Sequence, residues 1–156
     1  MTAHTLQAVG HSKLPHELPP ELPPMASRFV EVAKLPWTKT PHAGVETKTL
    51  LIERETGLMT MLVRMAPGAR LPDHEHVLIE QTYVLEGSLI CGEGECKAGD
   101  YVWRPAGSRH EAWAGSRGGL MLAMFQVPNK FFEADGRETD VTGQDWNAAW
   151  AKALFR

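Results

Sequence analysis

The sequence predicts one all-β domain, built as a sandwich or barrel. The chain has 156 residues, of which 43% are hydrophobic and 22% are charged, and this size and composition are typical of one globular domain with a single core. Between Arg28 and Val127, short strand-like runs alternate with turn residues, and their spacing is typical of β-sandwiches and barrels. No internal repeat of fixed period stands out. The expected strands cover residues 45–55, 58–65, 81–92, 101–107, 111–115 and 120–127.

The two ends of the chain have different patterns from this central region. Residues 14–24 hold five prolines in eleven positions, which predicts an extended, partly polyproline-II arm because proline cannot donate to a regular ladder. Near the other end, Trp146, Trp150 and Leu154 follow one another at four-residue steps. This spacing predicts one apolar stripe on a short helix that docks on the barrel. We therefore expect a proline-rich arm over residues 1–27, a β-domain over 28–135 and a C-terminal segment over 136–156.

Charge and hydropathy argue against several classes of partner. The formal net charge is −3 and the chain has no cluster of lysine and arginine, so neither nucleic acid nor an anionic membrane surface is an expected partner. Residues 1–25 contain histidines and prolines where a secretory leader would be apolar, and no run approaches the ~18 apolar residues of a membrane span. The expected location is the cytoplasm.

The stretch HEHVLIEQTYVLEG, which begins at His74, carries the strongest functional signal. Side chains alternate along a strand, so His74 and His76 should share one face while Glu75 points away. Glu80 can join them if the chain bends between the two segments. His110 is the candidate fourth partner, because it follows a turn and opens the next expected strand.

These four side chains predict a metal site. A single histidine in a strand is more often a hydrogen-bonded core or surface residue than a ligand, but three histidines and a carboxylate in this arrangement reverse that expectation. Neutral imidazole and one carboxylate oxygen suit a borderline divalent metal. The prediction is one divalent ion per chain, either iron, zinc, nickel, manganese or copper, bound by His74, His76, Glu80 and His110.

The spacing of these residues resembles the two motifs of the cupin family. In the first motif a glycine precedes His-x-His and a glutamate and a further glycine follow it; in the second a glycine precedes Pro-x-Gly, and a histidine and an asparagine follow. Nine of the ten motif positions match, and Ala114 stands where the asparagine would be. The resemblance covers residues 45–127 and implies a jelly-roll β-barrel with the metal inside. The matching residues are Gly68, His74, His76, Glu80 and Gly87, followed by Gly99, Pro105, Gly107 and His110.

Within the cupins, further segments are similar to a group that includes acetylacetone-cleaving dioxygenases and the cupin domain of ChrR-type anti-sigma factors. These segments are residues 44–50, 83–87, 98–101 and 131–136, followed by a tryptophan-containing helix. The dioxygenase resemblance implies Fe(II), O2 and a small diketone or aromatic ketone as substrate. In such an enzyme we expect Glu80 to act as a mobile ligand or as the general base that removes the acidic proton of the substrate. Dioxygenases of that group typically bind iron through three histidines, whereas ChrR-type domains also have the glutamate. An anti-sigma role is not expected, because residues 1–27 have no cysteine and no helical pattern.

Two other classes of function stay open at this point. A metal-dependent lyase or isomerase uses the same ligands without O2, and a sensor module binds metal or ligand without turnover.

The resemblance also bears on assembly, because cupins commonly form symmetric dimers and a β-barrel leaves edge strands to protect. We therefore expect a homodimer in which residues near 14–40 cross to the neighbouring subunit.

The remaining polar and sulfur-containing residues have simpler expected roles. Cys91 and Cys96 flank a hairpin turn and are expected to be reduced, half-buried thiols rather than a disulfide or a second metal site. Arg64 and Arg104 are expected to face solvent, with an orientation into the barrel toward an anionic substrate as the alternative. We expect solvated side chains at His4, His11, His16 and His42. We expect core or pocket-lining side chains at Met59, Met61, Met65, Met121, Met124 and Phe125.

Overall fold

A computed structural model describes residues 6, 7, 27 and 29–155, and it confirms the all-β class. The expected proline-rich segment lies outside the described residues, and the domain boundaries at residues 27 and 135 stay predictions. The strands are β1 (Leu6–Gln7), β2 (Thr38–Lys39), β3 (Val45–Glu53), β4 (Met59–Met65), β5 (Arg70–Glu75), β6 (Glu80–Cys91), β7 (Gly94–Lys97), β8 (Tyr101–Arg104), β9 (Arg109–Phe125), β10 (Lys130–Phe132) and β11 (Glu138–Thr139). The helices are η1 (Val32–Lys34), α1 (Trp146–Trp150) and η2 (Ala151–Phe155), of which η1 and η2 are 3-10 helices.

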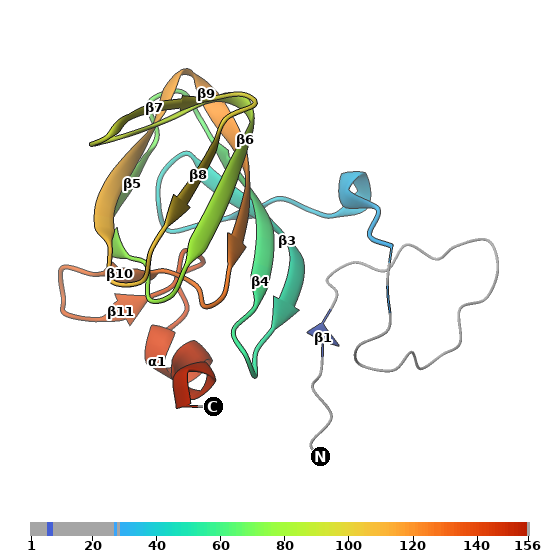
Figure 1. Cartoon of the computed structure of the whole chain (residues 1–156), viewed down its shortest axis with the longest axis vertical. Coiled ribbons are helices and arrows are strands. Elements are labelled where there is room, and N and C mark those ends of the chain that lie inside the picture. Colours follow the sequence, from blue (N-terminus) through green and yellow to red (C-terminus); the bar gives the residue numbers. More distant parts are fainter. Residues whose placement is uncertain (1–5, 8–26, 28, 156) are drawn as a thin grey trace.

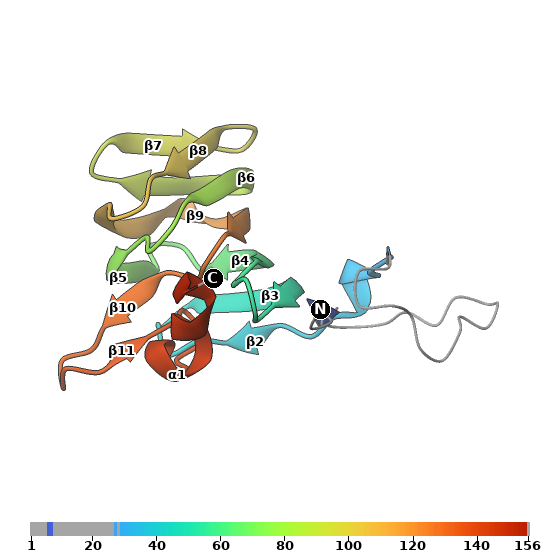
Figure 2. The same cartoon turned by 60° about the horizontal axis from the view of Figure 1, so that its bottom comes forward.

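The strands form a curled antiparallel sheet that encloses the core (Figure 1). Along the main path the order is β1-β3-β4-β9-β5-β10-β11, and β6 pairs with β7, β8 and β9. Figure 2 shows β6, β7 and β8 at one end of this arrangement and α1 at the opposite end. The barrel therefore has a hairpin end built from β6–β8 and an end covered by the C-terminal segment.

One long strand, β9, joins the two parts of the barrel. The sequence pattern predicted two separate strands at 111–115 and 120–127, and this was wrong. The first part of β9 pairs with β5, the last part pairs with β4, and β6 pairs along both. Glycines allow the change of partner: Gly118 has a φ of +77°, and a Cβ on Gly87 would lie 2.0 Å from the carbonyl oxygen of Gly118. The glycines therefore bend the strand and allow close approach without ending it.

Alternating side chains fill the barrel with apolar residues. In β4, Met59, Met61, Val63 and Met65 point inward and are at most 5% exposed. Met121 and Phe125 of β9 are also buried. The core prediction is therefore confirmed for Met59, Met61, Met65, Met121 and Phe125. Burying one such side chain contributes roughly 1.5–3 kcal/mol to folding.

The C-terminal helix docks through its two tryptophans, as predicted. The side chain of Asp145 caps α1 by accepting a hydrogen bond from the backbone N–H of Ala148. Trp146 Nε1 donates to the carbonyl oxygen of Pro128, and Trp150 Nε1 donates to a carboxylate oxygen of Asp140. Leu154 was expected on the same stripe, but it is 40% exposed. The chain continues as the 3-10 helix η2 after Trp150, and the tighter turn changes the direction of later side chains.

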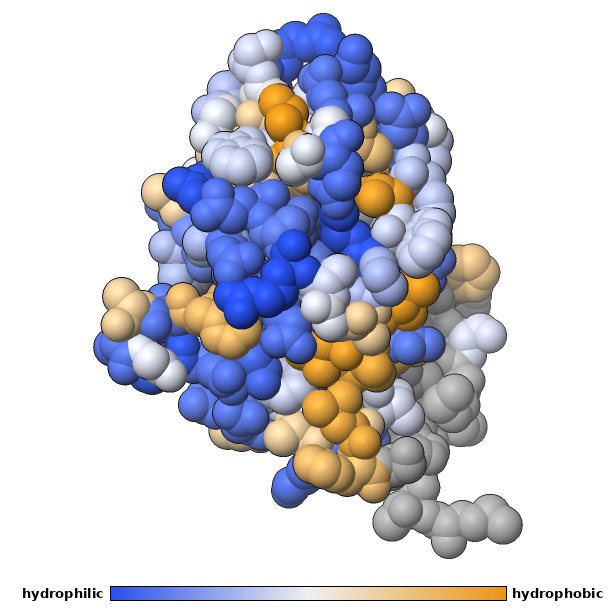
Figure 3. Space-filling view, turned by 60° about the vertical axis from the view of Figure 1, so that its left-hand side comes forward, coloured by the Kyte–Doolittle hydropathy of each residue, from blue (hydrophilic) through white to orange (hydrophobic). Residues whose placement is uncertain are grey.

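The surface of the molecule is mixed in hydropathy. In the space-filling view, hydrophilic residues cover much of the upper and middle part of the face, while hydrophobic residues gather toward the bottom (Figure 3). Within the part of the chain that the structure describes, no helix has the length and apolar character needed to cross a membrane.

Candidate metal centre

Three histidines reach the barrel interior from two neighbouring strands and the loop between β5 and β6. His74 lies near the end of β5 and is the ladder partner of His110 in β9. His76 lies just after β5, where its backbone N–H donates to the carbonyl oxygen of Ser108 and its carbonyl accepts from Gly107 N–H at 2.7 Å. Gly107 has a φ of +79°, so the predicted turn before His110 needs glycine there and fixes the position of His76.

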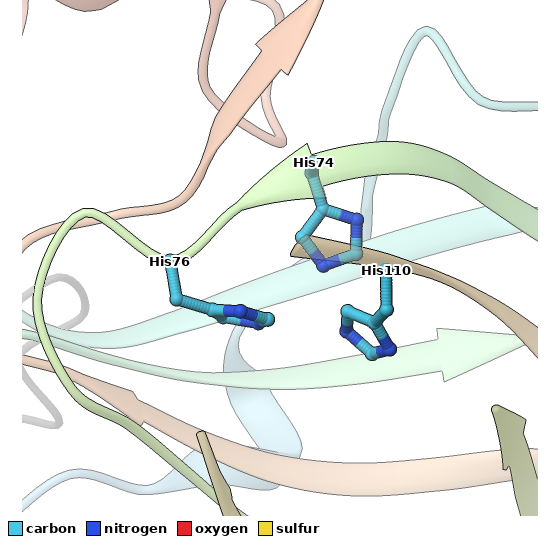
Figure 4. A group of neighbouring side chains, drawn as sticks. All are labelled: His74, His76 and His110. Atoms are coloured by element: carbon cyan, nitrogen blue, oxygen red, sulfur yellow. The ribbon is translucent and has the colours of Figure 1, made fainter. Parts of the chain in front are cut away.

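The three imidazole rings converge on one point (Figure 4). One ring nitrogen from each of His74, His76 and His110 lies within 4.8 Å of the other two. The ring centroids are 4.6–5.1 Å apart. The structure thus brings together the three histidines that the sequence analysis selected. A divalent metal with nitrogen ligands at about 2.0–2.1 Å needs such convergence.

Hydrogen bonds fix the orientation of two of these rings. His74 Nδ1 lies 2.8 Å from the carbonyl oxygen of Pro72, and His76 Nδ1 lies 3.1 Å from that of Ser108. A carbonyl only accepts, so each Nδ1 carries the hydrogen; the Ser108 hydroxyl beside His76 is already donating to Pro105. In the neutral form of each ring, Nε2 is then the nitrogen that keeps a lone pair, which is the arrangement that metal-binding histidines usually show.

Two ring nitrogens at the centre are buried without a hydrogen-bond partner. They are His76 Nε2 and His110 Nδ1. Burial, followed by the charge of His74, lowers the pKa of His110 to about 3, and burial also lowers the pKa of His74. Burial therefore favours the neutral form of His74 and His110, which can donate a lone pair. Imidazole nitrogens gathered around one point in this way fit a bound divalent metal.

Glu80 lies beside this cluster at the start of β6. One carboxylate oxygen accepts a hydrogen bond from Thr82 Oγ1 at 2.7 Å, and the other accepts from Asn129 Nδ2 at 2.5 Å. The second oxygen is also 3.1 Å from His76 Nε2. Burial opposes ionisation, but hydrogen bonding and charge from His76, together with the Asn129 hydrogen bond, lower the pKa of Glu80 to about 2. Glu80 therefore contacts one of the three imidazoles as a carboxylate, and its role as a fourth ligand stays a prediction.

The cluster forms one wall of a narrow cavity inside the barrel. Its accessible volume is about 40 Å³, which suits a few water molecules or a very small ligand before any opening of the barrel. Most of the lining is apolar, and the charged groups are Glu80 and Arg104. Of the residues expected in the pocket, Met61, Met121 and Phe125 line it. The other lining residues are Val63, Leu71, His74, Thr82, Leu89, Val102, His110, Ala112, Ala123, Asn129, Phe131 and Val141.

Arg64 and Arg104, whose direction the strand pattern left open, lie on opposite sides of the barrel wall. Arg64 is exposed, pairs with Glu46 and lies over the ring of Trp37 at 4.0 Å, as predicted. Arg104 was also expected to face solvent, and this was wrong, because its side chain is only 12% exposed and lines the cavity. In β8 the exposed residues are Tyr101 and Trp103, so alternation directs Arg104 inward together with Val102.

Two aromatic rings that the sequence pattern did not identify pack against the histidine cluster. Phe131 of β10 stacks on His74 with ring centroids 4.7 Å apart. His42 packs on Phe131 at the same distance. The prediction that His42 is solvated was wrong, since its Nε2 is buried and burial lowers its pKa. No local sequence pattern marks these residues or Asn129, because they reach the site only through tertiary folding. The other three histidines that the sequence predicts to be solvated, His4, His11 and His16, lie outside the described residues.

The two cysteines are free thiols, as predicted. Cys91 is buried and Cys96 is partly buried. In the β6–β7 ladder, Cys91 lies opposite Gly94 and Cys96 lies opposite Leu89, so the two thiols are not direct cross-strand partners.

Comparison with known proteins agrees with this geometry. The sequence profile of the ChrR Cupin-like domain matches residues 25–130. The chain belongs to this family. The match confirms the cupin resemblance derived from the spacing of the histidines and glycines. No protein with curated function matches the chain significantly in sequence.

Solved cupin structures are similar to this domain over most of its length. A putative acetylacetone dioxygenase from Methylibium petroleiphilum PM1 has 22% identity and a TM-score of 0.67, with 86% of this chain and 99% of that chain covered. The acetylacetone dioxygenase from Acinetobacter johnsonii has 17% identity and a TM-score of 0.65, with 94% and 99% covered. A chain from the complex of Rhodobacter sphaeroides SigE with the anti-sigma ChrR has 25% identity and a TM-score of 0.52, with 60% and 51% covered. At the identities of the two dioxygenases, the likeness establishes the fold alone.

Proposed function

We propose that this cupin is an iron(II)-dependent dioxygenase that acts on a small diketone or aromatic ketone. The observation that carries the proposal is the convergence of the His74, His76 and His110 imidazoles, two of which have a buried nitrogen without a hydrogen-bond partner. A bound divalent metal would act there as a Lewis acid for the two oxygens of an enolate and would provide a binding position for O2. Iron(II) is the proposed ion, and zinc, nickel and manganese are the alternatives.

The side chains around the centre have defined roles in this proposal. Glu80 accepts the acidic proton of the substrate, because its carboxylate lines the cavity beside His76 and is held ionised. Asn129 and Thr82 keep that carboxylate in place through their hydrogen bonds. Met61, Met121 and Phe125 contribute an apolar wall, which limits access of water to reactive species.

The proposed reaction balances with O2 as the only co-substrate. A diketone R–CO–CH2–CO–R′ reacts with one O2, and the carbon–carbon bond between the methylene carbon and one carbonyl carbon breaks. One oxygen atom enters each fragment, which gives a carboxylic acid and a 2-oxoaldehyde. The substrate carbons are oxidised and O2 is reduced, so no further electron donor is needed.

Oxygen uptake tests this proposal directly. Protein loaded anaerobically with Fe(II) is mixed with β-diketones and hydroxylated aryl ketones in an oxygen electrode, and product formation is followed in parallel. We expect uptake with at least one compound, and none with the His110→Ala variant. Absence of uptake for the whole panel would contradict the dioxygenase proposal.

A second candidate is a module that binds metal or a small ligand without turnover. Membership of the ChrR Cupin-like family favours it, since a related fold occurs in a complex of SigE with the anti-sigma ChrR. Such a module would show altered metal affinity in the Glu80→Gln variant and no substrate conversion. A lyase or isomerase, the third alternative, would convert a substrate without consuming O2.

The predicted homodimer has a candidate surface on the hairpin end of the barrel. Tyr83, Tyr101 and Trp103 are 41–58% exposed on the outer side of β6 and β8, and Tyr83 lies opposite Tyr101. Among the described strands, β8 pairs only with β6, so its other edge is open for pairing. We expect the chain to be a dimer in light scattering and the Trp103→Glu variant to be a monomer; a wild-type monomer at micromolar concentration would contradict the prediction.

A further inference from the structure

Arg104 brings a positive charge into a cavity whose lining is otherwise mostly apolar. Its side chain is 12% exposed and it shares the cavity with His74, Glu80 and His110. Among the described lining residues, it is the only lysine or arginine. A buried guanidinium needs an anionic or hydrogen-bonding partner, because its desolvation is otherwise unfavourable.

In this structure the anionic partner of Arg104 is the carboxylate of Glu93. Both Arg104 Nη1 and Nη2 donate to the two carboxylate oxygens of Glu93, the second at 3.4 Å. This fork-to-carboxylate arrangement is the one by which arginine recognises carboxylates in general. The inner carboxylate, Glu80, is instead held by Thr82 and Asn129, so it does not take the place of Glu93.

The Glu93 carboxylate lies at a distance from the histidines that a small ligand can span. One of its oxygens is within 4.8 Å of a ring nitrogen of His110 and of the sulfur of Cys91. Glu93 belongs to the turn between β6 and β7, and its side chain is 63% exposed. The Glu93 carboxylate can therefore leave Arg104 without movement of the barrel core and be solvated by water, while another anion takes its place on the buried guanidinium.

We infer that Arg104 binds a carboxylate group of the substrate and that Glu93 occupies this position in the free protein. The inference rests on the proposed function and narrows its substrate to small diketones or ketones that also carry a carboxylate group, for which the 3-oxo acid acetoacetate serves as a simple binding probe. A carboxylate that replaces Glu93 on Arg104 lies within a few atoms of the histidine cluster. The neighbouring oxo or enol oxygen of the same molecule is then directed at the cluster, which orients the substrate at two points.

Ligand binding to protein that cannot turn over provides the test. The probes are acetoacetate and its near isostere acetylacetone, which differ in carrying a carboxylate or a neutral acetyl group. Affinities are measured by calorimetry on zinc-loaded protein and on metal-free protein. The variants are Arg104→Gln, Arg104→Lys and Glu93→Gln. The matched controls are Arg64→Gln and Glu46→Gln, which remove the same charges from an ion pair outside the cavity.

The inference gives a specific pattern of affinities. Wild-type protein binds acetoacetate at least tenfold more tightly than acetylacetone. Arg104→Gln loses at least tenfold for acetoacetate and under twofold for acetylacetone, Arg104→Lys lies between, and Glu93→Gln binds acetoacetate more tightly because its competitor has gone. The two controls behave like the wild type. Equal affinity of the two probes for wild-type protein, or tight acetoacetate binding by a folded Arg104→Gln variant, overturns the inference.

Failure of the proposed function gives a different result. Wild-type protein that takes up no zinc contradicts the metal centre, while the comparison of Arg104 and Glu93 variants on metal-free protein still decides the anion site. Conversely, metal uptake with no preference for acetoacetate removes the carboxylate site and leaves the metal centre intact. Glu93→Gln keeps the test valid if Arg104→Gln fails to fold, since weaker or unchanged acetoacetate binding in Glu93→Gln also overturns the inference.

Discussion

The site has a carboxylate at its inner end, inside the cavity, and another at its outer end, on the turn between β6 and β7, but the two are held in different ways. At the inner end, Glu80 has a side chain that is 14% exposed, and it is fixed by Thr82 and Asn129 beside His76. At the outer end, Glu93 is 63% exposed and its carboxylate is bonded to the guanidinium of Arg104. Burial strengthens the first set of contacts and solvent weakens the second.

This difference separates a fixed part of the site from an exchangeable part. Moving Glu80 would leave the polar atoms of Asn129 and Thr82 without partners in the interior, which is costly. Moving Glu93 transfers one carboxylate to water and leaves Arg104 available to a ligand. The inner end is therefore suited to holding a proton acceptor in one geometry, and the outer end is suited to binding and release.

The largest expected effect comes from removing the inner charge. Glu80→Gln has nearly the same shape but is a poor proton acceptor, so we expect turnover to fall by about 10²–10⁴-fold if Glu80 is the general base. Much of the metal should be retained, because His74, His76 and His110 are unchanged. Steady-state rates and metal content are measured on the same preparation. Wild-type turnover in Glu80→Gln would remove the catalytic role.

The next largest effect is a loss of stability when the hydrogen bond from Asn129 to Glu80 is removed. Asn129 is 6% exposed, and Asn129→Ala leaves the Glu80 carboxylate without one buried donor, so we expect a loss of about 1–3 kcal/mol in the free energy of unfolding. Asn147→Ala is a matched control, because Asn147 donates to Glu138 at an exposed position; it should change stability by under about 0.5 kcal/mol. Urea denaturation of both variants gives the comparison, and similar small losses would show that the inner hydrogen bond is not important for stability.

A smaller effect is expected at the outer end. Glu93→Gln should lower the free energy of unfolding by under about 1 kcal/mol, because the Glu93 side of the pair is exposed and the amide oxygen of glutamine still accepts a hydrogen bond from the guanidinium of Arg104. The same urea experiment applies, with Glu46→Gln as the control for the exposed pair with Arg64. A loss as large as that of Asn129→Ala would remove the distinction between a fixed and an exchangeable end.

The smallest effect is a change in acid sensitivity at His42. Burial lowers the pKa of His42 below its usual value of 6.5, so the unfolded chain takes up a proton that the folded protein resists as the pH falls below about 6.5. The stability associated with neutral His42 is present above pH 6.5 and is lost as the pH falls toward the folded pKa. His42→Gln should therefore lose less stability than wild type between pH 7.5 and 5.5. Parallel curves of unfolding free energy against pH would contradict this account.

Local spacing carries enough information to predict some features. Strand alternation and motif spacing select His74, His76 and His110, which converge in the structure, while the role of Glu80 as a fourth ligand stays a prediction. The apolar period of α1 predicts the burial of Trp146 and Trp150. The sequence did not predict that β9 is continuous, because glycine is ambiguous between a strand end and a bend. It also misplaced Arg104, since the phase of the short strand β8 was not fixed by its sequence.

Other features depend on contacts between distant parts of the chain. Asn129 reaches Glu80 across 49 positions in the sequence, and His42 packs on Phe131, which stacks on His74. Neither belongs to a periodic pattern. Such residues are selected by the packing around the site, which single-sequence patterns do not describe.

Metal content is the most direct test of the central claim that the three histidines form a metal centre. Protein purified without added metal, and then loaded with Fe(II) or Zn(II), is analysed for bound metal by elemental analysis, with folding checked by circular dichroism. We predict about one ion per chain in the wild type and in the His42→Ala control, and almost none in folded His76→Ala and His110→Ala, because the barrel core is apolar and does not depend on the metal. Full occupancy in His110→Ala, or a wild-type protein that binds no divalent ion, would contradict the account.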